Sequence, residues 1–260
     1  MKRIITLFLL IGLCLSGTLY AQTSTKAFKS GEYLKFRITY GVLNAGIATL
    51  ELSDTIENGI PVYHAKGIGY TTGVPKLFFK VYDDYQSYFE KNSVIPHRFI
   101  RKIDEGGYTK NQEGFFDYKK KKVKVKDYEK DTTKEFDIVK DVQDIVSAFY
   151  YLRKYPKLNE LKVGESIEID MFFDGEVFRF KLKYLGEEVL KSKFGRIKSM
   201  KFRPYVMAGR VFKEKESLTV WVSSDSNKVP LRIKASLAVG SLKADLEEYE
   251  GLVTDMVFTK

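Results

Sequence analysis

The chain has 260 residues, a net charge of +10 and 14% aromatic residues, including 17 tyrosines and 19 phenylalanines. Two histidines and one cysteine argue against a disulfide scaffold, a thiol enzyme and a transition-metal site built on those residues. Aromatic and β-branched side chains favour strands, so the composition predicts a mainly β protein.

Residues 1–21 are predicted to be a signal peptide. Two basic residues precede an apolar run at 4–15, and a cleavage site follows before Gln22. The apolar run is shorter than the roughly 20 residues that a membrane-spanning helix needs. Cys14 lies inside this run, after Leu13 and not after the small residue of a lipobox, so we assign it to the leader. We expect an exported protein of the periplasm or cell envelope, with no membrane span after leader removal.

The first half of the remaining chain alternates apolar and polar residues with the period of two that is typical of strands. Asn44-Ala45-Gly46 and Asn58-Gly59 are predicted turns. Residues 73–80 break the alternation, either as a short helical turn starting near Pro75 or as a bulged strand entry. The predicted strands are 32–40, 47–52, 61–70, 82–90, 96–103, 107–118 and 121–128.

The segment from Asp141 to Pro156 predicts the principal helix, about 141–155. Asp141 or Asp144 can cap its start, and Pro156 ends it. We expect this helix to cover the inner face of a curved sheet. Its apolar stripe, spaced for a 3.6-residue period, consists of Val142, Ile145, Val146, Phe149 and Leu152.

The second half returns to strands. Segments 166–173 and 176–184 form a predicted hairpin closed by Asp174-Gly175, a favoured pair for a type I′ turn. The remaining predicted strands are 187–192, 197–204, 214–223, 230–239 and 242–249.

The predicted fold is therefore mainly β, with antiparallel curved sheet or sheets forming a half-barrel or barrel-like domain under one principal covering helix. Residues 22–260 form a single β-rich domain, either continuous or made of two β subregions, about 30–140 and 160–252, joined by the helix.

No catalytic residue, metal site or cofactor is predicted. His64 and His97 lack metal-ligand spacing, and the chain has neither a G-x-S-x-G elbow nor a Gly-rich phosphate loop. In the doublets Asp83-Asp84 and Glu187-Glu188, adjacent strand residues point to opposite faces. Neither doublet forms a catalytic pair by itself.

The lysine-rich segment 119–126 has two interpretations. It is a solubilising strand edge that discourages aggregation, or a surface for anionic lipid headgroups or acidic glycans. We expect no nucleic-acid partner, because exported proteins rarely meet nucleic acid.

A series of short motifs runs along most of the chain: Gly31-Glu32 with Leu34, Phe36 and Tyr40; Ala45-Gly46; Leu77-Phe78; Asp84–Ser87; Pro96; Asp144–Arg153; Val220-Trp221-Val222-Ser223 with Asp225; and Val229-Pro230. In this order they resemble the exported bacterial family labelled domain of unknown function 3108. Leader and size are similar to those of its Bacteroidetes members. The resemblance implies no settled activity and supplies no catalytic residues. A more distant likeness to the half-barrel carriers of the Lol pathway concerns the fold alone.

The leading functional hypothesis is non-catalytic binding of a lipidic or glycan envelope component in an apolar pocket under the helix. Phe149, Tyr150, Arg153 and Trp221 are the candidate ligand-binding residues. The alternatives are that aromatic residues simply fill the core and that Arg153 pairs with a strand carboxylate. Two other functions stay open: a structural or assembly protein contacting another envelope protein, and a carboxylate-dependent envelope hydrolase. The sequence makes no prediction of the oligomeric state.

Overall fold

The computed structural model describes residues 26–205, 218–237 and 240–260. The predicted signal peptide and Cys14 lie outside these residues. The strands are β1 (Glu32–Tyr40), β2 (Leu43–Glu57), β3 (Ile60–Thr71), β4 (Val81–Glu90), β5 (Pro96–Glu105), β6 (Tyr108–Asp117), β7 (Lys122–Asp127), β8 (Thr132–Asp137), β9 (Ser166–Phe173), β10 (Glu176–Ser192), β11 (Gly195–Tyr205), β12 (Leu218–Ser223), β13 (Pro230–Ser236) and β14 (Ser241–Glu250). The helices are α2 (Pro75–Phe78), α3 (Ile145–Arg153) and a 3₁₀ turn, η1 (Leu158–Glu160).

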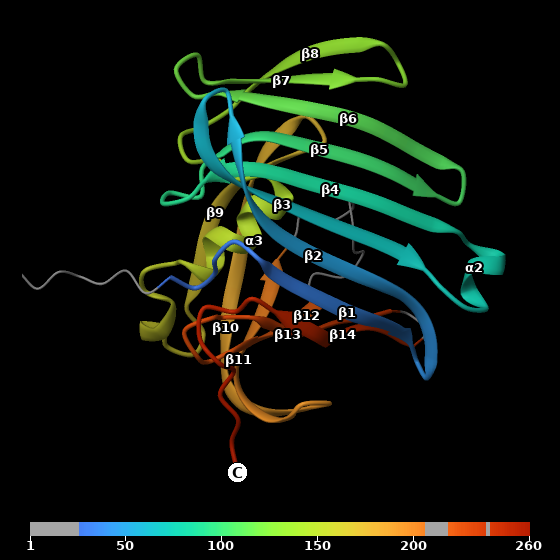
Figure 1. The fold of residues 1–260 in the computed structure, drawn as a ribbon, viewed down its shortest axis with the longest axis vertical. Helices are drawn as coiled ribbons and strands as arrows, with labels where there is room; N and C mark the ends of the chain where they lie inside the picture. Colours follow the sequence, from blue (N-terminus) through green and yellow to red (C-terminus); the bar gives the residue numbers. More distant parts are fainter. Residues whose placement is uncertain (1–25, 206–217, 238–239) are drawn as a thin grey trace, which may run out of the picture.

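All described strands belong to one antiparallel sheet made of two meanders. Strands β1 to β8 follow one another in space, as do β9 to β14, and the meanders join where β1 pairs with β14. The sheet curls around α3, which lies on its concave side (Figure 1). The prediction of a mainly β, antiparallel, barrel-like fold with one principal covering helix is confirmed.

The two edge strands of the curled sheet approach each other. The ring of Phe136 on β8 lies 5.7 Å from that of Phe172 on β9. Gln143, between β8 and α3, makes a parallel bridge with Met171 on the free edge of β9. Its amide donates to the carbonyl of Asp170 at 2.9 Å. The chain leading into α3 therefore covers an edge that would otherwise be unpaired.

The helix is shorter than the predicted 141–155, because residues 141–143 precede its first turn and Gln143 pairs with β9. Asp144, the second of the two predicted caps, accepts hydrogen bonds from the amides of Val146 and Ser147. The predicted apolar stripe is also partly wrong. Ile145 is 44% exposed, whereas the polar side chains of Ser147 and Arg153 are buried. Both side chains are hydrogen-bonded where they are buried: Ser147 Oγ accepts from the Asp144 amide in the capping box of the helix, and Arg153 donates to Glu32.

The turn predicted at Asn58-Gly59 and the type I′ turn predicted at Asp174-Gly175 are confirmed, and both residues of each pair have positive φ. The turn predicted at Asn44-Ala45-Gly46 is wrong. The chain reverses at Gly41-Val42, with Gly41 at φ +57°. Gly46 lies within β2, where a Cβ atom would sit 2.6 Å from the carbonyl oxygen of Tyr70 on β3. Close strand approach, not turn geometry, accounts for this glycine.

Two other details differ from expectation, and a third decides between two interpretations left open by the sequence. Strand β8 was not predicted, because TTKEFD holds a single large apolar residue. Strand β10 is continuous through a bulge near Gly186, where two strands were expected. The break at 73–80 is the short helix α2, the first of the two interpretations. The predicted strand residues 214–217 and 238–239 lie outside the described part of the chain.

The core consists of four apolar clusters around and beside α3. Phe149 packs against two of them, one containing Tyr150 and Phe89 and the other containing Trp221. Among the described residues, no helix has the length and apolar character required to cross a bilayer.

Candidate functional site

A cavity of about 290 Å³ opens on the concave side of β4 to β8, between the sheet, the N-terminus of α3 and the β9–β10 turn. Its lining follows the register of the sheet. Tyr85, Arg101, Gln112, Asp127 and Thr132 are successive cross-strand partners on β4, β5, β6, β7 and β8. Cross-strand partners point to the same face, and all five line the cavity. We call this set the polar row.

One step deeper, the next set of cross-strand partners is mostly apolar. Phe99, Gly114 and Val125 follow one another on β5, β6 and β7. A Cβ atom on Gly114 would lie 2.0 Å from the ring of Phe99, so this glycine makes room for the phenyl ring. Phe172 stands 6.0 Å from Phe99, ring to ring. The cavity therefore changes from polar near its mouth to apolar at its floor. We call Phe99, Val125, Phe136 and Phe172 the apolar floor.

The mouth carries a three-residue ion cluster that joins the two meanders. A single oxygen of Asp174, in the β9–β10 turn, accepts from Arg101 Nη1 at 2.5 Å and from Lys110 Nζ at 2.6 Å. Burial opposes ionisation of Asp174, but the hydrogen bond from Lys110 and the charge of Arg101 outweigh it and lower the pKa of Asp174. Arg101 also lies 4.3 Å from the ring centre of Phe173.

Two further lysines of the lining are exposed: Lys130 in the β7–β8 turn, and Lys134, the partner of Val125 on the edge strand β8. The lining thus has four basic and three acidic side chains. Because Asp174 already neutralises part of the charge of Arg101 and Lys110, the cationic groups face the cavity entrance without forming a strongly charged surface. An acidic headgroup near this entrance would meet several hydrogen-bond donors of positive charge.

The inner end of the cavity is closed by Asp144, the cap of α3. Its carboxylate accepts from Ser87 Oγ at 2.6 Å and from the amides of Val146 and Ser147, each at 2.8 Å. Burial raises the pKa of Asp144 to about 6, although these three donors favour the ionised form. The carboxyl group is therefore engaged in holding the helix start.

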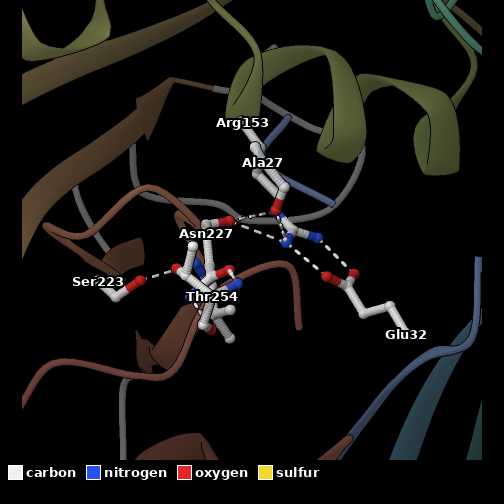
Figure 2. Close-up of polar contacts among 7 residues, drawn as sticks. Ala27, Glu32, Arg153, Ser223, Asn227 and Thr254 are labelled. Carbon is white, nitrogen blue, oxygen red and sulfur yellow. Dashed lines mark hydrogen bonds and ion pairs between the residues drawn. The ribbon is translucent and has the colours of Figure 1, made fainter. Parts of the chain in front are cut away.

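Arg153, one of the predicted site residues, lies away from this cavity in a buried polar network (Figure 2). Its guanidinium donates to Glu32 Oε1 at 2.6 Å and Oε2 at 2.7 Å, and to the carbonyls of Ala27 and Asn227. Asn227 in turn binds the backbone of Thr254. Pairing of Arg153 with a strand carboxylate, the alternative interpretation, is what the structure shows.

The other three predicted residues lie in the core. Tyr150 is fully buried between Phe28 and Phe89, and Phe149 stacks edge-on against it at 5.2 Å. Trp221 is buried in the adjoining cluster, and its indole N–H donates to the Glu188 carboxylate. The structure brings Phe149, Tyr150 and Arg153 together beneath the sheet. None of the four predicted residues lines the cavity described above.

The residues at the cavity mouth were missed by sequence reasoning. The sequence pattern assigns Asp174 only to a turn, and it singles out neither Arg101 nor Lys110. A usable signal exists for Arg101, which shares the inward alternation of Phe99 and Ile103 in β5. A basic residue on an apolar-facing position of a strand suggests a specific role.

Carboxylates elsewhere follow the expected alternation. Asp83 and Asp84 point to opposite faces, and Asp84 accepts from Gln86 on its own face. Burial and the nearby Glu105 raise the pKa of Asp83 to about 6, but neither Asp83 nor Glu105 lines the cavity. Within the described residues, no group of three or more His, Cys, Asp or Glu side chains is arranged to hold a metal ion.

The chain belongs to the family described as "Protein of unknown function (DUF3108)", whose model matches residues 35–247. This confirms the family resemblance over that range. No curated protein matches the chain.

The solved structures similar to the chain include two from other families of unknown function. A beta-barrel-like protein of domain of unknown function DUF1849 from Brucella abortus has a TM-score of 0.57 and 10% identity, covering 86% of this chain and 98% of that one. A DUF1089 family protein from Pseudomonas aeruginosa has a TM-score of 0.37 and 10% identity, covering 74% and 90%. The first likeness concerns the fold alone, and the second is too weak to support an argument.

Proposed function

We propose that this member of the DUF3108 family is an exported protein of the periplasm or cell envelope that binds a lipidic envelope component without catalysis. The export and an origin in the Bacteroidetes branch rest on the leader and on the resemblance described above. The binding rests on one observation, the cavity whose polar row lies outside an apolar floor.

The order of the two rows favours an amphiphile over a glycan. An apolar tail buried against Phe99, Val125 and Phe172 gains free energy in proportion to its buried area. A glycan needs hydrogen-bond partners at the same depth, and the floor offers aromatic and aliphatic side chains instead. Arg101 and Lys110 at the mouth suit an acidic headgroup.

The cavity volume limits the size of the ligand. About 290 Å³ lies near the lower end of small-molecule pockets, which hold about 300–1,000 Å³. A single acyl chain or a small amphiphile fits such a volume better than a lipid with several chains.

Two observations support binding without catalysis. The Asp144 carboxylate is engaged by three hydrogen-bond donors at the helix start, and Asp174 is paired with two basic side chains. Neither carboxyl group is placed as an unengaged acid or base facing the floor of the cavity.

The test uses the chain from Gln22 onward, purified from its native envelope and extracted for mass spectrometry, followed by titration with a fluorescent fatty acid. Thr132→Trp places an indole in the cavity from the edge strand. Thr133→Trp, the matched control, changes the next residue, which is also exposed but does not line the cavity. We expect Thr132→Trp to abolish binding and Thr133→Trp to preserve it. An empty native protein that does not bind the fatty acid would refute the proposal.

A further inference from the structure

One end of the sheet carries large apolar side chains in solvent. We call this set the apolar rim; its members are Val42, Leu43, Val74, Phe78, Phe79 and Tyr108. Val42 is 97% exposed and Phe78 is 84% exposed. Folding gains little from side chains left so exposed, so the rim is a candidate contact surface.

The rim comes from three connections that the antiparallel order brings to the same end: β1–β2, β3–β4 with α2, and β5–β6 (Figure 1). The Thr72 amide donates to the carbonyl of Ala45 at 3.0 Å, which joins the first two connections. The Gly106 amide donates to the carbonyl of Lys80 at 2.8 Å, which joins the second and third. The apolar side chains therefore belong to one continuous border of the sheet.

The mouth of the cavity lies at the same end. Lys110 follows Tyr108 by two residues, and the turns β7–β8 and β9–β10, which contribute Lys130 and Asp174 to the mouth, are at this end too. A surface that receives the rim would also face the cavity entrance.

Of the three connections that form the rim, β3–β4 supplies two lysines and no acidic residue, whereas β5–β6 carries Asp104 and Glu105. Residues 38–47 and 71–81 contain Lys76 and Lys80 and no Asp or Glu. Both lysines are exposed, and Lys80 makes only a long, solvent-exposed ion pair with Asp104, at 3.5 Å. Aromatic and aliphatic side chains flanked by lysines are the composition that binds the boundary of an anionic bilayer, because the apolar groups enter the acyl region and the ammonium groups reach the headgroups.

We propose that the apolar rim docks the protein on a lipid surface that contains anionic headgroups, with Val42, Val74 and Phe78 entering the boundary region. Docking in this orientation places the cavity mouth against the lipid. The rim is a surface distinct from the cavity lining, so docking does not require a ligand in the cavity.

The test measures co-sedimentation of the chain from Gln22 onward with vesicles of phosphatidylcholine, with and without phosphatidylglycerol. We expect binding to the anionic vesicles, weaker binding to the neutral ones, and a decrease with added salt. Val42→Asp and Phe78→Asp should each lower the partition coefficient by about tenfold or more. Each removes an apolar side chain that would enter the bilayer and adds a negative charge that anionic headgroups repel.

Ile56→Asp is the matched control, because Ile56 is 70% exposed on β2 at the opposite end from Val42. We expect it to bind vesicles like the wild type. Absence of binding to anionic vesicles, or an equal loss with Ile56→Asp, would overturn the proposal. A concentration-dependent dimer that Val42→Asp dissociates, without vesicle binding, would assign the rim to self-association instead.

Titration with the fluorescent fatty acid in vesicle-free solution separates this proposal from the proposed function. The rim variants should keep wild-type affinity in that titration. Loss of vesicle binding with intact fatty-acid binding would concern the rim alone. Vesicle binding by a protein that takes up no fatty acid would support docking and refute the proposed ligand binding in the cavity.

Discussion

Arg153 at the end of α3 and Glu32 at the start of β1 form a two-pronged ion pair, 121 residues apart in sequence, with side chains 3% and 0% exposed. The carbonyls of Ala27 and Asn227 take further guanidinium hydrogens. The pair therefore joins the helix to the first strand, the N-terminal segment and the β12–β13 connection. The attraction between the two charges offsets the cost of removing them from water only while both partners are present.

Arg153→Met should lower the free energy of unfolding by about 3–5 kcal/mol, because Glu32 is left charged and buried. Urea denaturation measures the change. Arg179→Met is the control, since Arg179 pairs with Asp170 while its side chain is 59% exposed, and we expect a loss of less than about 1 kcal/mol. The double variant Glu32→Gln, Arg153→Met should recover part of the loss. Equal losses of unfolding free energy for Arg153→Met and Arg179→Met would contradict the role assigned to the buried ion pair.

Asp144 should make stability depend on pH. Burial raises its pKa from 3.8 to about 6 in the folded protein, so between about pH 4 and pH 6 the folded protein holds a proton that the unfolded chain has released. The unfolding free energy contributed by this group therefore falls as pH rises through that window, by up to about 3 kcal/mol, and is level above it.

Asp144→Asn removes the titration and keeps a good helix cap. The wild type should lose stability relative to this variant between pH 4 and pH 7, as measured by urea denaturation at each pH. Other titrating groups, including Asp83, are present in both proteins and cancel in the difference. A difference that is constant with pH would contradict the raised pKa.

Asp174 forms ion pairs with Arg101 and Lys110, the two basic groups that we assign to a ligand headgroup. Asp174→Asn should raise affinity for the anionic fluorescent fatty acid severalfold, because Arg101 and Lys110 lose a competing carboxylate, while Asn-Gly preserves the type I′ turn. Arg101→Gln should lower that affinity by about tenfold, the value of a charge-assisted hydrogen bond. Lys102→Gln, the neighbour on the opposite face of β5, should have no effect. An unchanged affinity in the first two variants would remove Arg101 from the ligand site.

Gly46→Ala should destabilise the sheet by about 1–3 kcal/mol, the usual cost of overpacking, because the new methyl group would lie 2.6 Å from the Tyr70 carbonyl oxygen. Gly69→Ala on the adjacent β3 is the control, since a Cβ atom there meets no atom within 4 Å. Thermal unfolding of the two variants should separate them clearly. Similar melting temperatures would show that β2 can shift away from β3.

The site was harder to predict than the fold because the lining of the cavity depends on the register between strands. Alternation along β5 places Phe99 and Arg101 on one face, and this is visible in the sequence. The polar row exists only because Arg101 pairs with Gln112 and Gln112 with Asp127. A register change of one residue would turn these side chains outward. The sequence of a single strand does not contain its register.

Local chemistry was sufficient for the β-rich architecture, the turns at Asn58-Gly59 and Asp174-Gly175, and a helix capped by either Asp141 or Asp144, because each depends on residues close together in the chain. Tertiary structure decided the rest. It placed Arg153 in an ion pair with Glu32, extended residues 141–143 along the edge of β9, and brought Asp174 to Arg101 and Lys110 across the closing sheet. The helix of residues 145–153 thus covers the concave side of the sheet while its capped end closes a cavity. These relationships join segments many tens of residues apart, so they arise only when the two meanders pack together.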